Sequence, residues 1–184
     1  NMLDAGVNII KESLMATEAF LKARSGWNAV INADAAIREA TALAEEMSKE
    51  NILASQAKGN EALAFLEEAQ QDFSQAEAAY PGLDLAAFEA YVVKRMESQQ
   101  AALAADDAYL SRNKEELEAQ NSRYNALEEE AAALAQELGE DDPEQIVALR
   151  FYKEIEADQG AYEAERLKAG NADAFLREYL GTAS

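Results

Sequence analysis

The sequence predicts an all-α protein, and three observations support that fold class. The 184 residues include only two prolines and eight glycines, and the remainder is rich in strong helix formers such as Ala, Glu, Leu and Lys. Apolar residues recur at intervals of three and four. No segment alternates β-branched or aromatic residues with polar ones, as a strand would. We therefore expect residues 1–184 to form a single helical domain, either an antiparallel helical bundle or an elongated helical-hairpin array with coiled-coil-like heptad seams.

The first part of the chain predicts three helices separated by short turns. A helix over 3–23 should end at Ser25-Gly26, because glycine commonly terminates helices. A second helix over 27–49 carries apolar residues at heptad spacing, namely Val30, Ala33, Ile37, Ala40, Ala44 and Met47. Asn51 is then a turn residue or an N-cap, and a third helix over 52–80 ends at Pro81. The inward positions of this helix are Ile52, Ala62, Leu66, Ala69, Phe73, Ala76 and Tyr80.

Residues 83–138 contain neither glycine nor proline, and they have two interpretations. They form either one continuous helix over 84–138 or two helices over 84–110 and 113–138. Asn113 and Glu116 have the spacing of a capping box, which favours a break near Ser111. The predicted inward positions are Leu85, Phe88, Val92, Met96, Gln99, Leu103, Leu110, Leu117, Tyr124, Leu127, Ala131, Leu134 and Leu138, interrupted by Asp106 and Asn113.

The last part of the chain predicts two more helices. Asp142-Pro143 has the pattern of an N-cap followed by proline in the first helical turn, so a helix should run over 143–169. Gly170-Asn171 should end it, and a short helix over 172–180 follows.

Composition excludes most classes of catalytic and binding site. With no His and no Cys, the chain lacks Ser-His-Asp triads, thiolate nucleophiles, disulfides and zinc-imidazole sites. The 36 acidic and 16 basic side chains give a net charge of −20, which disfavours nucleic acid and anionic membrane surfaces as partners. No window is apolar enough for direct insertion into a membrane. We expect no enzymatic activity, no cofactor and no metal.

Carboxylate clusters are the remaining candidates for chemistry. Glu128–Glu130 and the group Glu115, Glu116 and Glu118 could pair carboxyls for acid and base catalysis. Neither run is embedded in apolar sequence, so both are interpreted as solvated helix faces. An acidic cluster lies in the predicted loop 139–142 and at the start of the helix that follows, and it consists of Glu140, Asp141, Asp142 and Glu144. It lacks the ligand order of an EF-hand calcium loop.

A partner interface is predicted from two kinds of residue. Some aromatic residues fall outside the predicted inward positions, and an exposed part of the 103–138 segment carries a leucine series. Together these candidate interface residues are Tyr91, Leu110, Leu117, Tyr124, Leu127, Phe151 and Tyr179.

One segment resembles the second half of a tetratricopeptide repeat. Ala69, Phe73, Ala76 and Pro81 follow the A-x3-F-x2-A-x4-P spacing of that family, over about 30 residues. Leu53 and Ala57 would then belong to the opening helix of the repeat. The resemblance implies stacked helix pairs that present a concave surface for a peptide or small ligand.

Two functions follow from these patterns. The first is a non-enzymatic interaction, scaffold or spacer protein that binds another protein or itself through its helical faces. The alternative is a tetratricopeptide-like helical-repeat module for a peptide or small ligand, as the soluble part of a bacterial envelope lipoprotein. Because the chain begins at Asn1 within an amphipathic pattern, we expect that a leader was removed, and we favour an extracytoplasmic location, secreted or envelope-anchored, over the cytoplasm.

Overall fold

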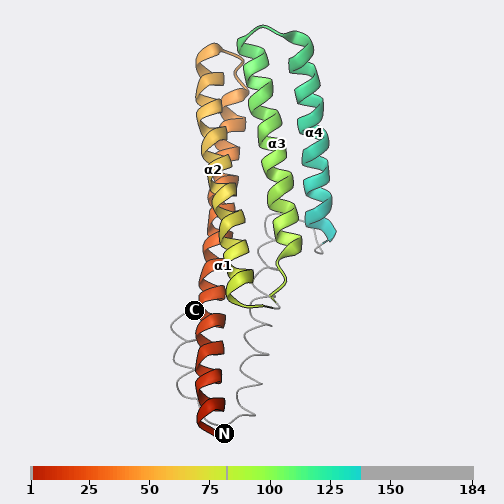
Figure 1. The fold of residues 1–184 in the computed structure, drawn as a ribbon. Coiled ribbons are helices and arrows are strands. Elements are labelled where there is room, and N and C mark those ends of the chain that lie inside the picture. The colour runs from red at the N-terminus through yellow and green to blue at the C-terminus, as the bar shows by residue number, and fades with distance from the viewer. Residues whose placement is uncertain (1, 82, 138–184) are drawn as a thin grey trace.

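The computed structural model describes residues 2–81 and 83–137, with side chains from residue 18 to residue 136. The described residues form four α-helices and no strand, which confirms the all-α class (Figure 1). The helices are α1 (Met2–Ala44), α2 (Lys49–Ala79), α3 (Ala86–Leu110) and α4 (Lys114–Glu137). The helices predicted over 143–169 and 172–180 lie outside the described residues.

The four helices are long and run up and down in sequence, each packed against the next (Figure 1). α1 pairs closely with α2, α2 with α3, and α3 with α4. Short connections between successive helices make them antiparallel neighbours. α1 and α4, at the two ends of this series, pack much less against each other. The polar groups described below lie between them.

The break predicted at Ser25-Gly26 is wrong, because α1 continues through both residues to Ala44. Gly26 is buried within the helix, and a Cβ added there would lie 2.8 Å from the ring of Phe73 on α2. Next to it, the Ser25 hydroxyl donates a hydrogen bond to Asp72 at 2.7 Å. Gly26 therefore allows α1 and α2 to approach closely, rather than ending a helix.

The turn between α1 and α2 falls earlier than predicted. α1 ends at Ala44, and Met47, predicted to face inward, is 56% exposed in the connection. Ser48 is the N-cap of α2 and its hydroxyl accepts a hydrogen bond from the backbone N–H of Asn51 at 3.2 Å. Asn51 is thus a residue of the first turn, where its side chain donates to Glu46 at 2.7 Å.

The structure of α2 does not fit the tetratricopeptide repeat that part of its sequence resembles. A repeat of that family folds about 34 residues into two helices joined by a turn. Here Leu53, Ala57 and Phe73 all belong to one unbroken helix of 31 residues, which ends at the C-cap Tyr80. Of the residues that match the repeat, Ala69, Phe73 and Ala76 are buried on one face of α2, whereas Pro81 is exposed. Ordinary packing of a long helix therefore accounts for the spacing of the three buried residues.

The break predicted near Ser111 is confirmed, and the continuous helix over 84–138 is wrong. Arg112 adopts a left-handed conformation with a φ of 60°. The backbone N–H of Arg112 donates to the carbonyl of Tyr109, and the backbone N–H of Asn113 donates to the carbonyl of Ala108. These two bonds form a Schellman motif that ends α3. The side chain of Asn113 then accepts from the N–H of Glu116 at 3.1 Å, as the capping box predicted.

The core is narrow because alanine supplies much of it. Buried residues of α2 recur every three or four positions and form one face of the helix: Ile52, Ser55, Gly59, Ala62, Leu66, Ala69, Phe73 and Ala76. Most inward positions predicted for α1 and α2 are buried, whereas Ala44 and Tyr80 are only partly so. Coiled-coil packing of these faces stays a prediction.

Candidate functional site

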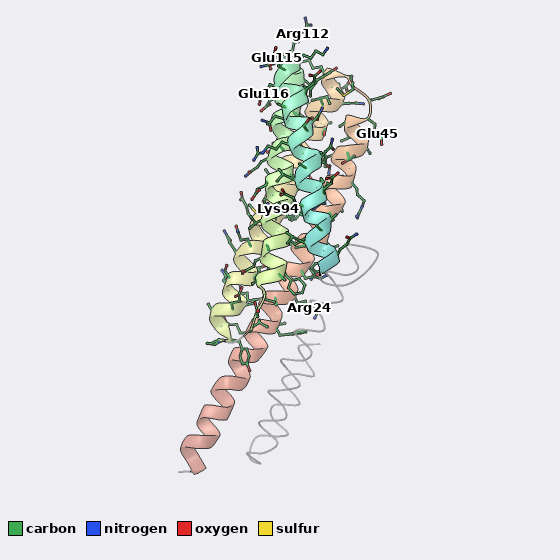
Figure 2. The ribbon with its side chains drawn as sticks, turned by 90° about the vertical axis from the view of Figure 1, so that its right-hand side faces the viewer. Arg24, Glu45, Lys94, Arg112, Glu115 and Glu116 are labelled. Atoms are coloured by element: carbon green, nitrogen blue, oxygen red, sulfur yellow. The ribbon has the colours of Figure 1, made fainter. Side chains whose placement is uncertain are left out.

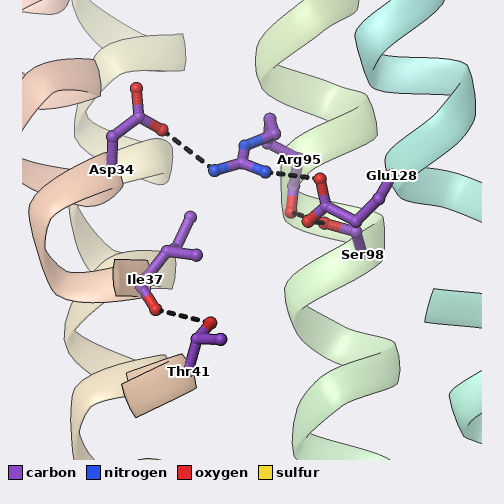
Figure 3. A network of polar contacts seen from close by, with 6 residues as sticks. All are labelled: Asp34, Ile37, Thr41, Arg95, Ser98 and Glu128. Atoms are coloured by element: carbon purple, nitrogen blue, oxygen red, sulfur yellow. Dashed lines mark hydrogen bonds and ion pairs between the residues drawn. The ribbon is translucent and has the colours of Figure 1, made fainter. Parts of the chain in front are cut away.

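A buried ion network joins α1, α3 and α4 (Figure 3). Arg95 of α3 extends one guanidinium nitrogen to Asp34 of α1 at 3.1 Å and the other to Glu128 of α4 at 2.5 Å. The hydroxyl of Ser98 lies 3.0 Å from the second carboxylate oxygen of Glu128 and 2.9 Å from the carbonyl of Arg95. The fork of a guanidinium suits this arrangement because it presents several donors in one plane.

The network is largely, but not fully, shielded from solvent and carries a net charge of −1. The side chains of Asp34, Arg95 and Glu128 are 5%, 12% and 25% exposed. Burial alone would lower the pKa of Arg95, but Tyr91, Glu128 and Asp34 outweigh it and raise that pKa. Removing one member would leave the others charged in a poorly solvated place, so the network holds α1 and α4 in a defined relation to α3.

A cavity of about 150 Å³ lies among all four helices, farther along the bundle. Its apolar wall consists of small residues: Ala40 and Ala44 of α1, and Ala102 and Ala105 of α3. Its polar groups come from every helix: Thr41, Ser55, Gln99, Asp106, Asn121 and Tyr124. Alanine leaves this space open because it fills little volume between helices that are held at a fixed distance.

Two cavity groups have shifted pKa values. Burial, and then the charge of the neighbouring Asp107, raise the pKa of Asp106 to about 6, while the Ser55 hydroxyl opposes the shift. Burial also raises the pKa of the Tyr124 phenol, and Glu128 raises it further against the opposing charge of Arg95. Tyr124 therefore links the cavity to the ion network one helical turn away.

A pair of carboxyls lies apart from the cavity, where α2 ends and α3 begins. Burial, followed by a hydrogen bond with Glu77 and the charges of Glu77 and Asp84, raises the pKa of Glu89 to about 7. A carboxyl with such a pKa can exchange a proton near neutrality. Within residues 2–81 and 83–137, however, no group of three or more metal-ligating side chains comes together.

The helix α4 presents an exposed surface at the edge of the bundle (Figure 2). We call residues 114–126 the α4 edge. No side chain of this segment is buried, and only Leu117, Gln120 and Tyr124 are partly covered. Figure 2 shows Glu115 and Glu116 near the start of α4, beside Arg112 of the connection.

The predicted interface residues occupy different environments. Tyr91 and Leu127 are 4% and 8% exposed within the chain's own core, so intramolecular packing accounts for both. Tyr124 is half-buried beside the cavity, and Leu117 is partly exposed on the α4 edge. Leu110 lies at the end of α3, where with Lys49, Tyr109 and Arg112 it borders a depression at the tip of the bundle. Phe151 and Tyr179 lie outside the described residues.

Sequence reasoning missed the ion network entirely. Glu128 was interpreted as part of a solvated face, and neither Asp34 nor Arg95 stood out as a functional residue. Arg95 lies 61 residues from Asp34 and 33 from Glu128, so no local pattern connects them. The only available signal was the position of Glu128 one turn after Tyr124, on the side of α4 that faces inward.

Comparisons with known proteins supply no relative from which a function could be inferred. No protein-family model, no curated protein and no solved structure matches the chain. In the part of the chain that the structure describes, no helix combines the length and apolar character needed to cross a bilayer.

Proposed function

We propose that this protein is a non-enzymatic helical interaction protein that binds a basic protein surface through the α4 edge. The observation that carries the proposal is the exposure of this segment. Among the described helices, α4 packs closely against α3 alone, and its first half contributes no buried side chain. A helix with one free side can accept a further helix or strand without any change in the rest of the bundle.

Charge favours a basic partner over a second copy of the chain. Residues 114–137 contain seven acidic and two basic side chains, a net charge of 2 − 7 = −5. The whole chain carries −20, so two copies repel each other. A partner with lysine and arginine around an apolar stripe would gain attraction from the carboxylates and contact with Leu117.

The ion network supports this function by fixing the position of α4. Because Arg95 holds Glu128 of α4 and Asp34 of α1 together, the bundle presents the α4 edge as a rigid surface. A preorganised surface loses less conformational entropy on binding than a mobile one.

Binding of a defined basic peptide tests the proposal. The probe is a fluorescent amphipathic peptide of about 20 residues, with leucine on one face and lysine on the other, long enough to cover the α4 edge. Fluorescence anisotropy measures its affinity for the wild type and for the double variant Glu115→Gln/Glu118→Gln. We expect the variant to bind several-fold more weakly, since each exposed charge pair contributes up to about 1 kcal/mol.

A matched variant distinguishes a site from general attraction to an acidic protein. Glu67 and Glu68 are exposed on α2, and Glu67→Gln/Glu68→Gln removes the same charge as the α4 variant. The proposal requires that this control binds the peptide like the wild type. Equal weakening by both variants would reject the α4 edge as the binding surface.

The compartment in which this binding takes place stays a prediction, with an extracytoplasmic location favoured.

A further inference from the structure

We propose that the cavity among the four helices is a binding site for a small organic monocation, such as a primary alkylammonium ion, with its charged end at Asp106. The site goes beyond the proposed function because it takes a different ligand and is formed by all four helices, although two of its lining residues, Asn121 and Tyr124, also belong to the α4 edge. Its lining combines one carboxylate, several neutral oxygen acceptors and a wall of alanine.

The size of the cavity sets the size of the ligand. Its volume of about 150 Å³ resembles that of an engineered protein cavity that holds benzene, so about six non-hydrogen atoms fit. The alanines at positions 40, 44, 102 and 105 would contact an apolar body, and the polar groups would orient one end of it.

The charges around the cavity select a cation. Asp106 is the only ionisable carboxyl of the lining, and no basic residue lines the cavity in the described part of the chain. Arg95 lies eleven residues before Asp106 on α3, about 16 Å along the helix axis, and is already paired with two carboxylates. An anion would therefore meet uncompensated negative charge, while a single carboxylate suits a monocation better than a divalent metal.

Gln99 contributes a further polar group to the site. Gln99 is 2% exposed and lines the cavity. A ligand in the cavity would therefore meet the amide of this side chain as well as the carboxylate of Asp106. Gly59 lies beside this amide, since a Cβ added there would be 4.0 Å from the Gln99 oxygen. The Gln99 carbonyl can accept one ammonium proton.

Comparison of three probes of nearly equal shape tests the charge preference on the wild-type protein. The probes are n-butylammonium, n-butanol and butyrate, titrated at constant ionic strength and pH 7.5. The readout is the chemical shift of the Gln99 side-chain amide and of the Ala102 and Ala105 methyl groups. We expect saturable shifts with n-butylammonium, at least tenfold weaker binding of n-butanol, and no saturable effect of butyrate.

Two variants assign the carboxylate. Asp106→Asn should reduce n-butylammonium affinity at least tenfold, whereas Asp107→Asn should leave it within about twofold, because Asp107 is exposed and hydrogen-bonded to Gln56 at 2.6 Å. Equal binding of n-butanol and n-butylammonium would overturn the charge preference. The absence of saturable shifts with all three probes would show that the cavity holds water only, which would overturn the site. Both outcomes are measured without the basic peptide, so they are distinguishable from a failure of peptide binding at the α4 edge.

Discussion

Gly26 of α1 lies directly against the ring of Phe73 of α2, at a distance that leaves no room for a side chain. A Cβ at position 26 would be 2.8 Å from two ring carbons of Phe73, a residue with no exposed surface. This contact sets how closely the two longest described helices approach each other. It also explains why a helix of 43 residues tolerates a glycine in its interior.

The first prediction is that Gly26→Ala destabilises the protein although alanine is the better helix former. The change gains up to about 1 kcal/mol of helix propensity. Overpacking against a fixed aromatic ring costs about 1–3 kcal/mol, so we expect a net loss in the free energy of unfolding. Urea denaturation followed by circular dichroism measures it.

Gly59→Ala is the matched control for Gly26→Ala. Its added Cβ would lie 2.9 Å from Cδ2 of Leu103, the end of a flexible and only partly buried side chain. Because Leu103 can change rotamer, we expect Gly59→Ala to cost less than Gly26→Ala. The reverse order of the two variants would contradict the close contact of Gly26 with Phe73.

The second prediction concerns Arg95, whose loss should be among the most damaging single substitutions. Arg95→Met leaves Asp34 and Glu128 without their shared cation, and breaking a buried pair costs about 3–5 kcal/mol. The neighbouring Lys94 provides the control, since it pairs at the surface with Glu97 at 3.6 Å and Glu130 at 3.0 Å. Lys94→Met should cost less than about 1 kcal/mol in the same urea titration. Similar costs for the two variants would mean that the network contributes no more than a surface pair.

The third prediction is that Arg112→Gly stabilises the protein. Arg112 has a φ of 60°, a conformation that costs a residue with a Cβ about 1–2 kcal/mol and costs glycine little. We expect the thermal unfolding midpoint to rise. Ser111, with a φ of −87°, lies in the ordinary region, so Ser111→Gly should not raise the midpoint. A fall in the midpoint on Arg112→Gly would show that the arginine side chain contributes more than its backbone strain costs.

The fourth prediction is that stability increases as the pH falls from about 8 to about 5. The pKa values of Glu89 and Asp106 are raised to about 7 and about 6, above the ordinary values of 4.5 and 3.8 for these side chains. The folded state therefore binds more protons than the unfolded state in this window, so stability declines as the pH rises through the folded pKa values. Glu89→Gln should flatten the dependence of the unfolding midpoint between pH 6 and 8, whereas Glu67→Gln should leave it unchanged. An unfolding midpoint that rises with pH over this range would contradict the raised pKa values of both Glu89 and Asp106.

Sequence patterns correctly predicted the structural features that depend only on residues close together in the sequence. Helix-forming composition and spacing predicted the fold class, and Asn113 with Glu116 predicted the start of α4, because a capping box is contained in four residues. Ser48 could have been recognised in the same way, since a hydroxyl residue directly before a helix is a common N-cap.

The wrong or missing predictions concern features that depend on contacts between residues far apart in the sequence. A glycine that ends a helix and a glycine that admits a neighbouring ring look alike in sequence. What distinguishes Gly26 is Phe73, 47 residues later, and the same is true of Arg95 and its two carboxylates. The cavity likewise forms where small residues of separate helices meet at one level. Of its polar lining residues, the sequence pattern placed only Gln99, Asp106 and Tyr124 at inward positions.

The most direct test of the proposed function is residue-resolved NMR mapping of the basic amphipathic peptide on the wild-type protein. We expect amide chemical-shift changes to concentrate on the α4 edge, residues 114–126, and to leave the exposed face of α2 around Glu67 and Glu68 unaffected. Changes that spread evenly over the acidic faces, or that concentrate on α1 and α2, would reject the α4 edge as the binding surface.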